Sequence, residues 1–187
     1  MWEGFSMIRA IIGTIAVLAG FAVVEVSSDA GTGPGGSCRA SQVYVLLRPG
    51  EPVPVRAEPT PEGTVMGTLA TREMGQDAAP SIVVLTGSKR GWARIALDAR
   101  DYTAIDRAPH PYGWVPADHL AVDTRVDGVV NIHSRPGMLG DVVGRIENED
   151  QRFRVLGCRG DLLHVINAEK GNVWIDRWCA RSGGCRS

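Results

Sequence analysis

The sequence repeats one pattern of apolar residues, prolines and glycines within its 187 residues. Residues 55–69, VRAEPTPEGTVMGTL, align without a gap with residues 132–146, IHSRPGMLGDVVGRI. The similarity continues in the same order from 82–87 to 153–158, from 92–95 to 162–165 and from 114–120 to 174–180, with changed loop lengths. The identities in the ungapped stretch pair Pro59, Gly63, Val65 and Gly67 with Pro136, Gly140, Val142 and Gly144. This self-similarity predicts a duplicated structural unit of about 55–70 residues.

Short runs of β-forming residues make up each copy, and 23 Gly and 11 Pro favour short elements joined by turns. No stretch after residue 30 keeps the 3.6-residue apolar period of a helix over three turns, so we expect an all-β chain. Gly67 and Gly144 lie inside predicted strands, where glycine typically permits a bend or a close backbone approach. The runs in the first copy are VYVLL (43–47), VPVR (53–56), VMGTL (65–69), IVVL (82–85), WARIAL (92–97) and YGWV (112–115).

The order of these motifs resembles the bacterial SH3 domain family over about residues 51–180. The resemblance implies two small SH3-like barrels in tandem. Members of this family often occur in tandem behind a signal peptide. The second copy departs from the family pattern with Leu162 in place of Trp92 and without a glycine before Trp174. The motifs that carry the resemblance are VPVRAEP (53–59), MGTL (66–69), GWARI (91–95) and YGWVPADHL (112–120).

One long apolar run, residues 10–24, precedes the repeats. As a helix it would span about 22 Å, short of the roughly 30 Å hydrocarbon core of a membrane. Together with Arg9 and the small residues at 28–30, it predicts a signal peptide, with Met1 or Met7 as the start. An uncleaved membrane anchor and a buried core helix are the alternatives.

These features divide the chain into four predicted segments. They are a signal peptide or anchor helix at 1–30, a linker at 31–42, a first barrel at 43–123 with a long insertion at 97–112, and a second, disulfide-stapled barrel at 124–187.

All four cysteines lie in the part predicted to be exported, where an even number indicates disulfides. The spacing leaves three possible pairings of Cys38, Cys158, Cys179 and Cys185. No CxxC pair is present, and no histidine stands at ligand spacing from a cysteine, so no metal site is expected. No Gly-rich loop opens a helix, and no cofactor is expected.

The charge balance limits the partners. The part predicted to be exported has 19 Lys and Arg, because Arg9 lies before it. It has 18 Asp and Glu, because Glu3, Glu25 and Asp29 lie before it. A nucleic-acid partner, which requires a basic excess, is therefore not expected, and a membrane is expected only through the N-terminal segment if that segment is uncleaved. Any ligand must then be held by local chemistry.

Aromatic side chains are the candidate ligand-binding residues, since Trp and Tyr form flat platforms for peptides or sugars. Core packing is the alternative for each of them, above all for Trp114 and Trp174. The predicted ligand-binding set is Trp92, Tyr112, Trp114, Trp174 and Trp178. No catalytic residue is predicted, and Cys158 with His164 as a thiol dyad is the less favoured alternative to a disulfide.

The sequence therefore predicts an exported, periplasmic or secreted, non-enzymatic binding module of the bacterial cell envelope. The resemblance implies peptidoglycan, a cell-wall peptide or an envelope protein as the partner. The alternatives are a structural interaction protein without wall affinity and, less favoured, a cysteine hydrolase.

Overall fold

The computed structural model describes residues 36–46, 52–69, 80–98, 102–106, 110–137, 140–147, 149–181 and 185. The predicted signal segment and residues 31–35 of the predicted linker lie outside these ranges. Residues 31–187 form one compact unit. Among the described residues, no helix has the length and apolar character needed to cross a membrane.

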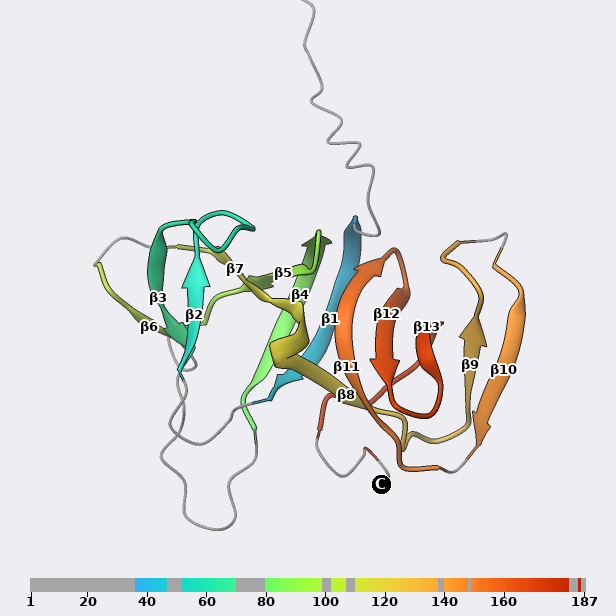
Figure 1. Cartoon of the computed structure of the whole chain (residues 1–187). Coiled ribbons are helices and arrows are strands. Elements are labelled where there is room, and N and C mark those ends of the chain that lie inside the picture. The colour runs from blue at the N-terminus through green and yellow to red at the C-terminus, as the bar shows by residue number, and fades with distance from the viewer. Residues whose placement is uncertain are drawn as a thin grey trace, which may run out of the picture. The chain divides into compact units, whose positions relative to one another are not determined.

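The described part of the chain is all-β, as the sequence predicts, and its strands form one antiparallel sheet of 13 strands. Across the sheet the order is β10-β9-β13-β12-β11-β8-β1-β4-β5-β7-β2-β3-β6 (Figure 1). The strands are β1 (Ser37–Val45), β2 (Val53–Arg56), β3 (Val65–Leu69), β4 (Ile82–Lys89), β5 (Trp92–Ala96), β6 (Tyr102–Ala104), β7 (Tyr112–Pro116), β8 (Leu120–Asp123), β9 (Val129–His133), β10 (Val142–Glu147), β11 (Arg152–Arg159), β12 (Leu162–Asn167) and β13 (Gly171–Ile175), with a 3₁₀ turn η1 (Ala117–His119) before β8.

Two segments differ from the sequence-based expectation. Residues 37–42 belong to β1 rather than to a linker, because their backbone pairs with β4 and Cys38 is bonded to Cys158. The insertion at 97–112 contains a further strand, β6, which pairs with β3 at one edge of the sheet. Both strands lack the strict apolar alternation by which a strand is recognised in a sequence.

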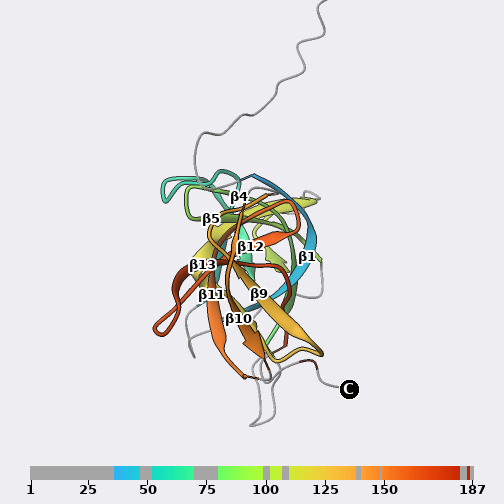
Figure 2. The same ribbon diagram turned by 90° about the vertical axis from the view of Figure 1, so that its right-hand side faces the viewer.

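The pairing of strands repeats within the sheet. In the first half, β2 pairs with β3 and β7, and β5 pairs with β4 and β7 (Figure 1). In the second half, β9 pairs with β10 and β13, and β12 pairs with β11 and β13; Figure 2 shows β9 and β10 side by side. The registers agree residue by residue, since Arg56 faces Trp114 as His133 faces Trp174. Bulges also recur at matching places in the β2–β3 and β9–β10 pairs and in the β4–β5 and β11–β12 pairs. The internal repeat of the sequence is thus a repeat of strand pairing.

The turn after β2 recurs after β9 in its hydrogen bonds. The Gly63 amide donates to the Thr60 carbonyl at 3.1 Å, and the Gly140 amide donates to the Gly137 carbonyl at 3.0 Å. A Cβ atom on Gly63 would lie 2.8 Å from the Glu58 carbonyl oxygen, and one on Gly140 would collide with the matching carbonyl. The close approach of backbone explains why both copies have glycine here.

The structure shifts one part of the sequence alignment by a single residue. Sequence similarity aligns 82–87 with 153–158. By strand register and bulge position, however, Leu85 corresponds to Val155 and Gly87 corresponds to Gly157. Leu156 is the bulge residue of β11 and corresponds to Thr86 rather than to Leu85. A bulge residue leaves the alternation of the strand, so an apolar side chain there misleads an alignment.

Strand β8 serves both halves. It pairs with β1 on one side and with β11 on the other, and all four of its residues are buried. Relative to β11 it occupies the place that β1 occupies relative to β4, because Val122 faces Phe153 as Val43 faces Val83. The boundary predicted after residue 123 therefore falls at the end of a strand that belongs to both pairing patterns.

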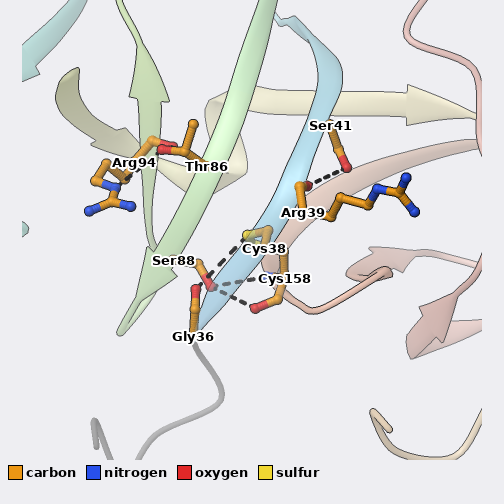
Figure 3. The surroundings of a disulfide bond; sticks show 8 residues. All are labelled: Gly36, Cys38, Arg39, Ser41, Thr86, Ser88, Arg94 and Cys158. Atoms are coloured by element: carbon orange, nitrogen blue, oxygen red, sulfur yellow. Dashed lines mark hydrogen bonds between the residues drawn. A yellow bond between two sulfur atoms is a disulfide. The ribbon is translucent and has the colours of Figure 1, made fainter. Parts of the chain in front are cut away.

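The long-range disulfide joins the two halves. Cys38 in β1 is bonded to Cys158 in β11, and Cys179 is bonded to Cys185, which selects one of the three possible pairings. Beside the first disulfide, the Ser88 hydroxyl of β4 donates to the Cys158 carbonyl at 3.2 Å and accepts from the Cys158 amide at 2.9 Å (Figure 3). Strands β1, β4 and β11 are thus tied together at one point.

Replacing Gly67 by alanine is expected to destabilise the protein by about 1–2 kcal/mol, as overpacking does. A Cβ atom there would collide with the Thr103 carbonyl oxygen and approach the Tyr102 ring to 2.5 Å, both on β6. Gly144→Ala is the matched control, since its Cβ would have only ordinary contacts with Ile132, the nearest at 3.5 Å. Denaturant unfolding of both variants measures the difference, and an equal effect would contradict the close packing of β6 on β3.

Candidate functional site

The alternation of β5 and β7 separates an inner face from an outer face. The inner side chains, among them Ala93, Ile95 and Val115, are fully buried. The outer side chains are half-buried or exposed, because alternate residues of a strand point to opposite faces. We call this surface the first outer face, and it consists of Arg56, Trp92, Arg94, Ala96, Tyr112, Trp114 and Pro116.

Two arginines flank the central tryptophan of the first outer face. Trp114 on β7 is paired with Arg94 on β5 and with Arg56 on β2. Tyr112, the most exposed aromatic residue of the face, has 51% of its surface accessible. The face therefore combines flat apolar rings with two guanidinium groups, a composition typical of sites that hold anionic groups.

The Arg94 side chain is held by its neighbours. Its Nε donates to the Thr86 hydroxyl at 3.1 Å, and this hydroxyl donates to the Arg94 carbonyl at 3.1 Å (Figure 3). Its guanidinium carbon lies 5.3 Å from the centroid of the Tyr112 ring, at the distance of a cation–π contact. These contacts orient the guanidinium and leave its two terminal nitrogens without a hydrogen-bond partner among the described residues.

The Arg56 side chain has a structural contact. Its Nη1 donates to the Gly63 carbonyl at 2.6 Å across the turn after β2. His133 makes the matching contact in the second half, where its Nδ1 lies 3.4 Å from the Gly140 carbonyl oxygen. The side chain at this position thus contacts a carbonyl oxygen of the turn in both halves. In the first half this side chain is an arginine and carries a positive charge.

The matching surface of the second half, the second outer face, has a different chemistry. Its residues are His133, Leu162, His164, Ile166, Asn172, Trp174 and Asp176. The His164 ring stacks on Trp174 with centroids 4.4 Å apart and an angle of 13° between the planes, and both residues are buried. Asp176 accepts hydrogen bonds from the Asn131 amide and side chain and lies 3.8 Å from His133. Histidines stand here in place of both arginines.

The five aromatic residues predicted to bind a ligand lie in three different settings. Trp92, Tyr112 and Trp114 lie together on the first outer face. Trp174 is 6% exposed and stacked in the second half. Trp178 packs against the core, and its indole nitrogen donates to the Gln42 carbonyl at 2.9 Å. The packing alternative considered from the sequence therefore describes Trp174 and Trp178.

Sequence reasoning missed Arg56 and Arg94. Arg94 stands two residues after Trp92 in the same predicted strand, so alternation could have placed both side chains on one face. Nothing in the sequence indicated that β2 and β5 lie on opposite sides of Trp114, since this follows from strand pairing.

The cysteines and histidines do not form a catalytic pair in the described residues. Cys158 is bonded to Cys38, and the His164 ring stacks on Trp174. No group of three or more His, Cys, Asp or Glu side chains gathers at metal-binding distance in the described part of the chain.

Comparison with known proteins gives no match: no family model, no curated protein and no solved structure matches the chain. The fold and the two outer faces are therefore the basis for a proposal on function.

Protonation of His164 is expected to destabilise the protein. Burial lowers the pKa of His164, while a hydrogen bond to Asn172 acts in the opposite direction. A histidine with a lowered pKa takes up its proton more readily in the unfolded chain, so stability is lost as pH falls below about 6.5 and levels off below the pKa of the folded state. The free energy of unfolding of wild type and His164→Gln, measured at several pH values, should diverge in pH dependence, whereas parallel profiles would contradict this prediction.

Proposed function

We propose that the chain is an exported, non-enzymatic binding module of the bacterial cell envelope that holds a peptidoglycan or cell-wall peptide or an envelope partner protein. In this proposal the two pairing patterns correspond to two SH3-like barrels in tandem behind a signal peptide. The resemblance in motif order supports the barrels, and the repeated registers, bulges and turns support the duplication.

The first outer face is the observation that carries the proposal. Three aromatic side chains and two arginines share this surface, and Tyr112 is half-exposed. Rings with a polar edge bind peptides by contact area and hydrogen bonding, without making or breaking bonds. The two disulfides are compatible with an oxidising compartment.

A structural interaction protein without wall affinity is the second candidate. Its support comes from β10, an edge strand in which Val142 and Val143 are 48% and 63% exposed. Exposed apolar residues on a strand edge favour pairing with another chain. The cysteine hydrolase has less support, because the sulfur of Cys158 is engaged in a disulfide.

Co-sedimentation of the purified chain with isolated peptidoglycan tests the proposal, with Tyr112→Ala and Val143→Thr as matched surface variants. We expect wild type and Val143→Thr to be retained and Tyr112→Ala to be retained less. If none of the three is retained at several salt concentrations, the wall-binding function is excluded. Cross-linking in cells, followed by identification of the linked protein, then tests the second candidate.

A further inference from the structure

The two outer faces share a backbone and differ in charge. Their inner sides are chemically alike, since Ile95 and Val115 correspond to Val165 and Ile175, and all four are fully buried. On the outer side, by contrast, both arginines of the first half are histidines in the second. The packing of the sheet therefore does not require arginine at either place.

Arg94 is the charged group of the first outer face that is oriented yet not neutralised. Its Nε is bonded to Thr86 and its plane lies near the Tyr112 ring, while no described carboxylate forms an ion pair with it. A guanidinium presents its terminal nitrogens in a fixed fork, which matches the two oxygens of a carboxylate.

Arg56 adds a second positive charge on the far side of Trp114. One of its nitrogens is engaged by the Gly63 carbonyl, and its charge contributes to the lowered pKa of Glu62, after the larger effects of hydrogen bonds from the Thr60 side chain and the backbone. One terminal nitrogen of Arg56 is thus already engaged by the turn, and Arg94 is the stronger candidate for direct contact with an anion.

We propose that the first outer face binds a carboxylate-bearing peptide, with Arg94 contacting the carboxylate and Trp114 and Tyr112 contacting the adjacent apolar part of the peptide. This site rests on the proposed binding function and specifies the chemical class of its ligand. The second outer face does not bind this class, because Asp176 stands where the first face has Pro116 and histidines stand where it has arginines. In a chain of nearly balanced charge, the local pair of arginines supplies the attraction that net charge does not.

The test uses the full chain with its disulfides intact and two short peptides that differ in one group. The probes are the tripeptide Ala-Glu-Ala and its counterpart Ala-Gln-Ala, both with an amidated C-terminus, titrated while the indole N–H signals of Trp92 and Trp114 are followed by NMR. We expect the acidic peptide to shift these signals and to bind about tenfold more tightly than the neutral one, as for a lost charge-assisted contact. Its affinity should fall as salt is added.

Two variants distinguish direct contact from a general effect of structure. Arg94→Gln should lower the affinity for the acidic peptide about tenfold, to the level of the neutral peptide, and Arg94→Lys should restore part of it. His164→Gln, at the matching position of the second outer face, should leave the affinity unchanged. Thermal unfolding of each variant shows whether it is folded at the temperature of the titration.

The outcomes separate this proposal from the general function. If neither peptide shifts the indole signals, if both bind equally, or if Arg94→Gln and His164→Gln have the same effect, the carboxylate site is refuted. Retention of Arg94→Gln on peptidoglycan, combined with any of those results, leaves the wall-binding function standing without this site. If the wild-type chain is not retained on peptidoglycan but binds the acidic peptide selectively, wall binding is refuted and the site is supported.

Discussion

Replacing Cys38 and Cys158 together by alanine is expected to lower the free energy of unfolding by about 5 kcal/mol. The two residues are separated by 120 positions, so the bond closes most of residues 31–187 into one loop. The entropy that a disulfide removes from the unfolded chain grows with the logarithm of the loop length. Because small proteins are stable by only about 5–15 kcal/mol, this loss is a large part of the total.

The second disulfide provides a matched control within the same protein. Cys179 and Cys185 are six positions apart, and the same relation gives about 2 kcal/mol for so short a loop. Urea unfolding of the two double variants and of wild type measures both values. A larger loss in the Cys179/Cys185 variant would contradict the assignment of the long-range bond as the main covalent stabiliser of the sheet.

Replacing Tyr44 by phenylalanine is expected to lower the free energy of unfolding by about 1.5–3 kcal/mol, the range for a hydrogen bond to a charged group. The Tyr44 hydroxyl donates to Asp123 Oδ1 at 2.7 Å, and both residues are 1% exposed. Arg152 lies beside them, with its Nε 3.4 Å from the same oxygen. These residues belong to β1, β8 and β11, so the contact joins the two halves of the sheet.

The same network predicts a dependence on alkaline pH. Burial, followed by the hydrogen bond to Asp123 and its charge, raises the pKa of Tyr44 well above its ordinary value. The unfolded chain then loses the tyrosine proton first, so stability should fall as pH rises above about 10. In Tyr44→Phe the free energy of unfolding should decrease less above this pH than in wild type. In Tyr112→Phe, which changes a half-exposed ring, it should decrease as in wild type, with little loss of stability at neutral pH. Equal effects of the two substitutions would contradict the buried role of Tyr44.

Much of the first half could be predicted from the sequence. The runs at 53–56 and 65–69 coincide with β2 and β3, and the predicted strands at 82–85, 92–97 and 112–115 lie within or nearly within β4, β5 and β7. These strands have one buried face, which imposes the alternation by which they are recognised. Strand β6 escaped prediction because it is short, is largely exposed and lies at an edge of the sheet.

The candidate site was predicted only in part. Aromatic side chains were named because rings are conspicuous in the sequence, but three of the five lie on one face and two serve in packing. The choice between packing and binding depends on which neighbours cover a ring. Such coverage depends on residues far away in the chain, as the contact of Trp178 with Gln42 shows.

The sequence alone determined that the chain is all-β and repeats itself, because alternation and the spacing of Gly and Pro are local properties that the backbone imposes on each strand and turn. Only the tertiary structure decided which cysteines pair, that β8 completes one half and begins the other, and that Arg56 and Arg94 flank Trp114. Each of these depends on strand pairing between distant segments. Pairing is determined by the packing of the whole sheet, and the same local pattern is compatible with many partners.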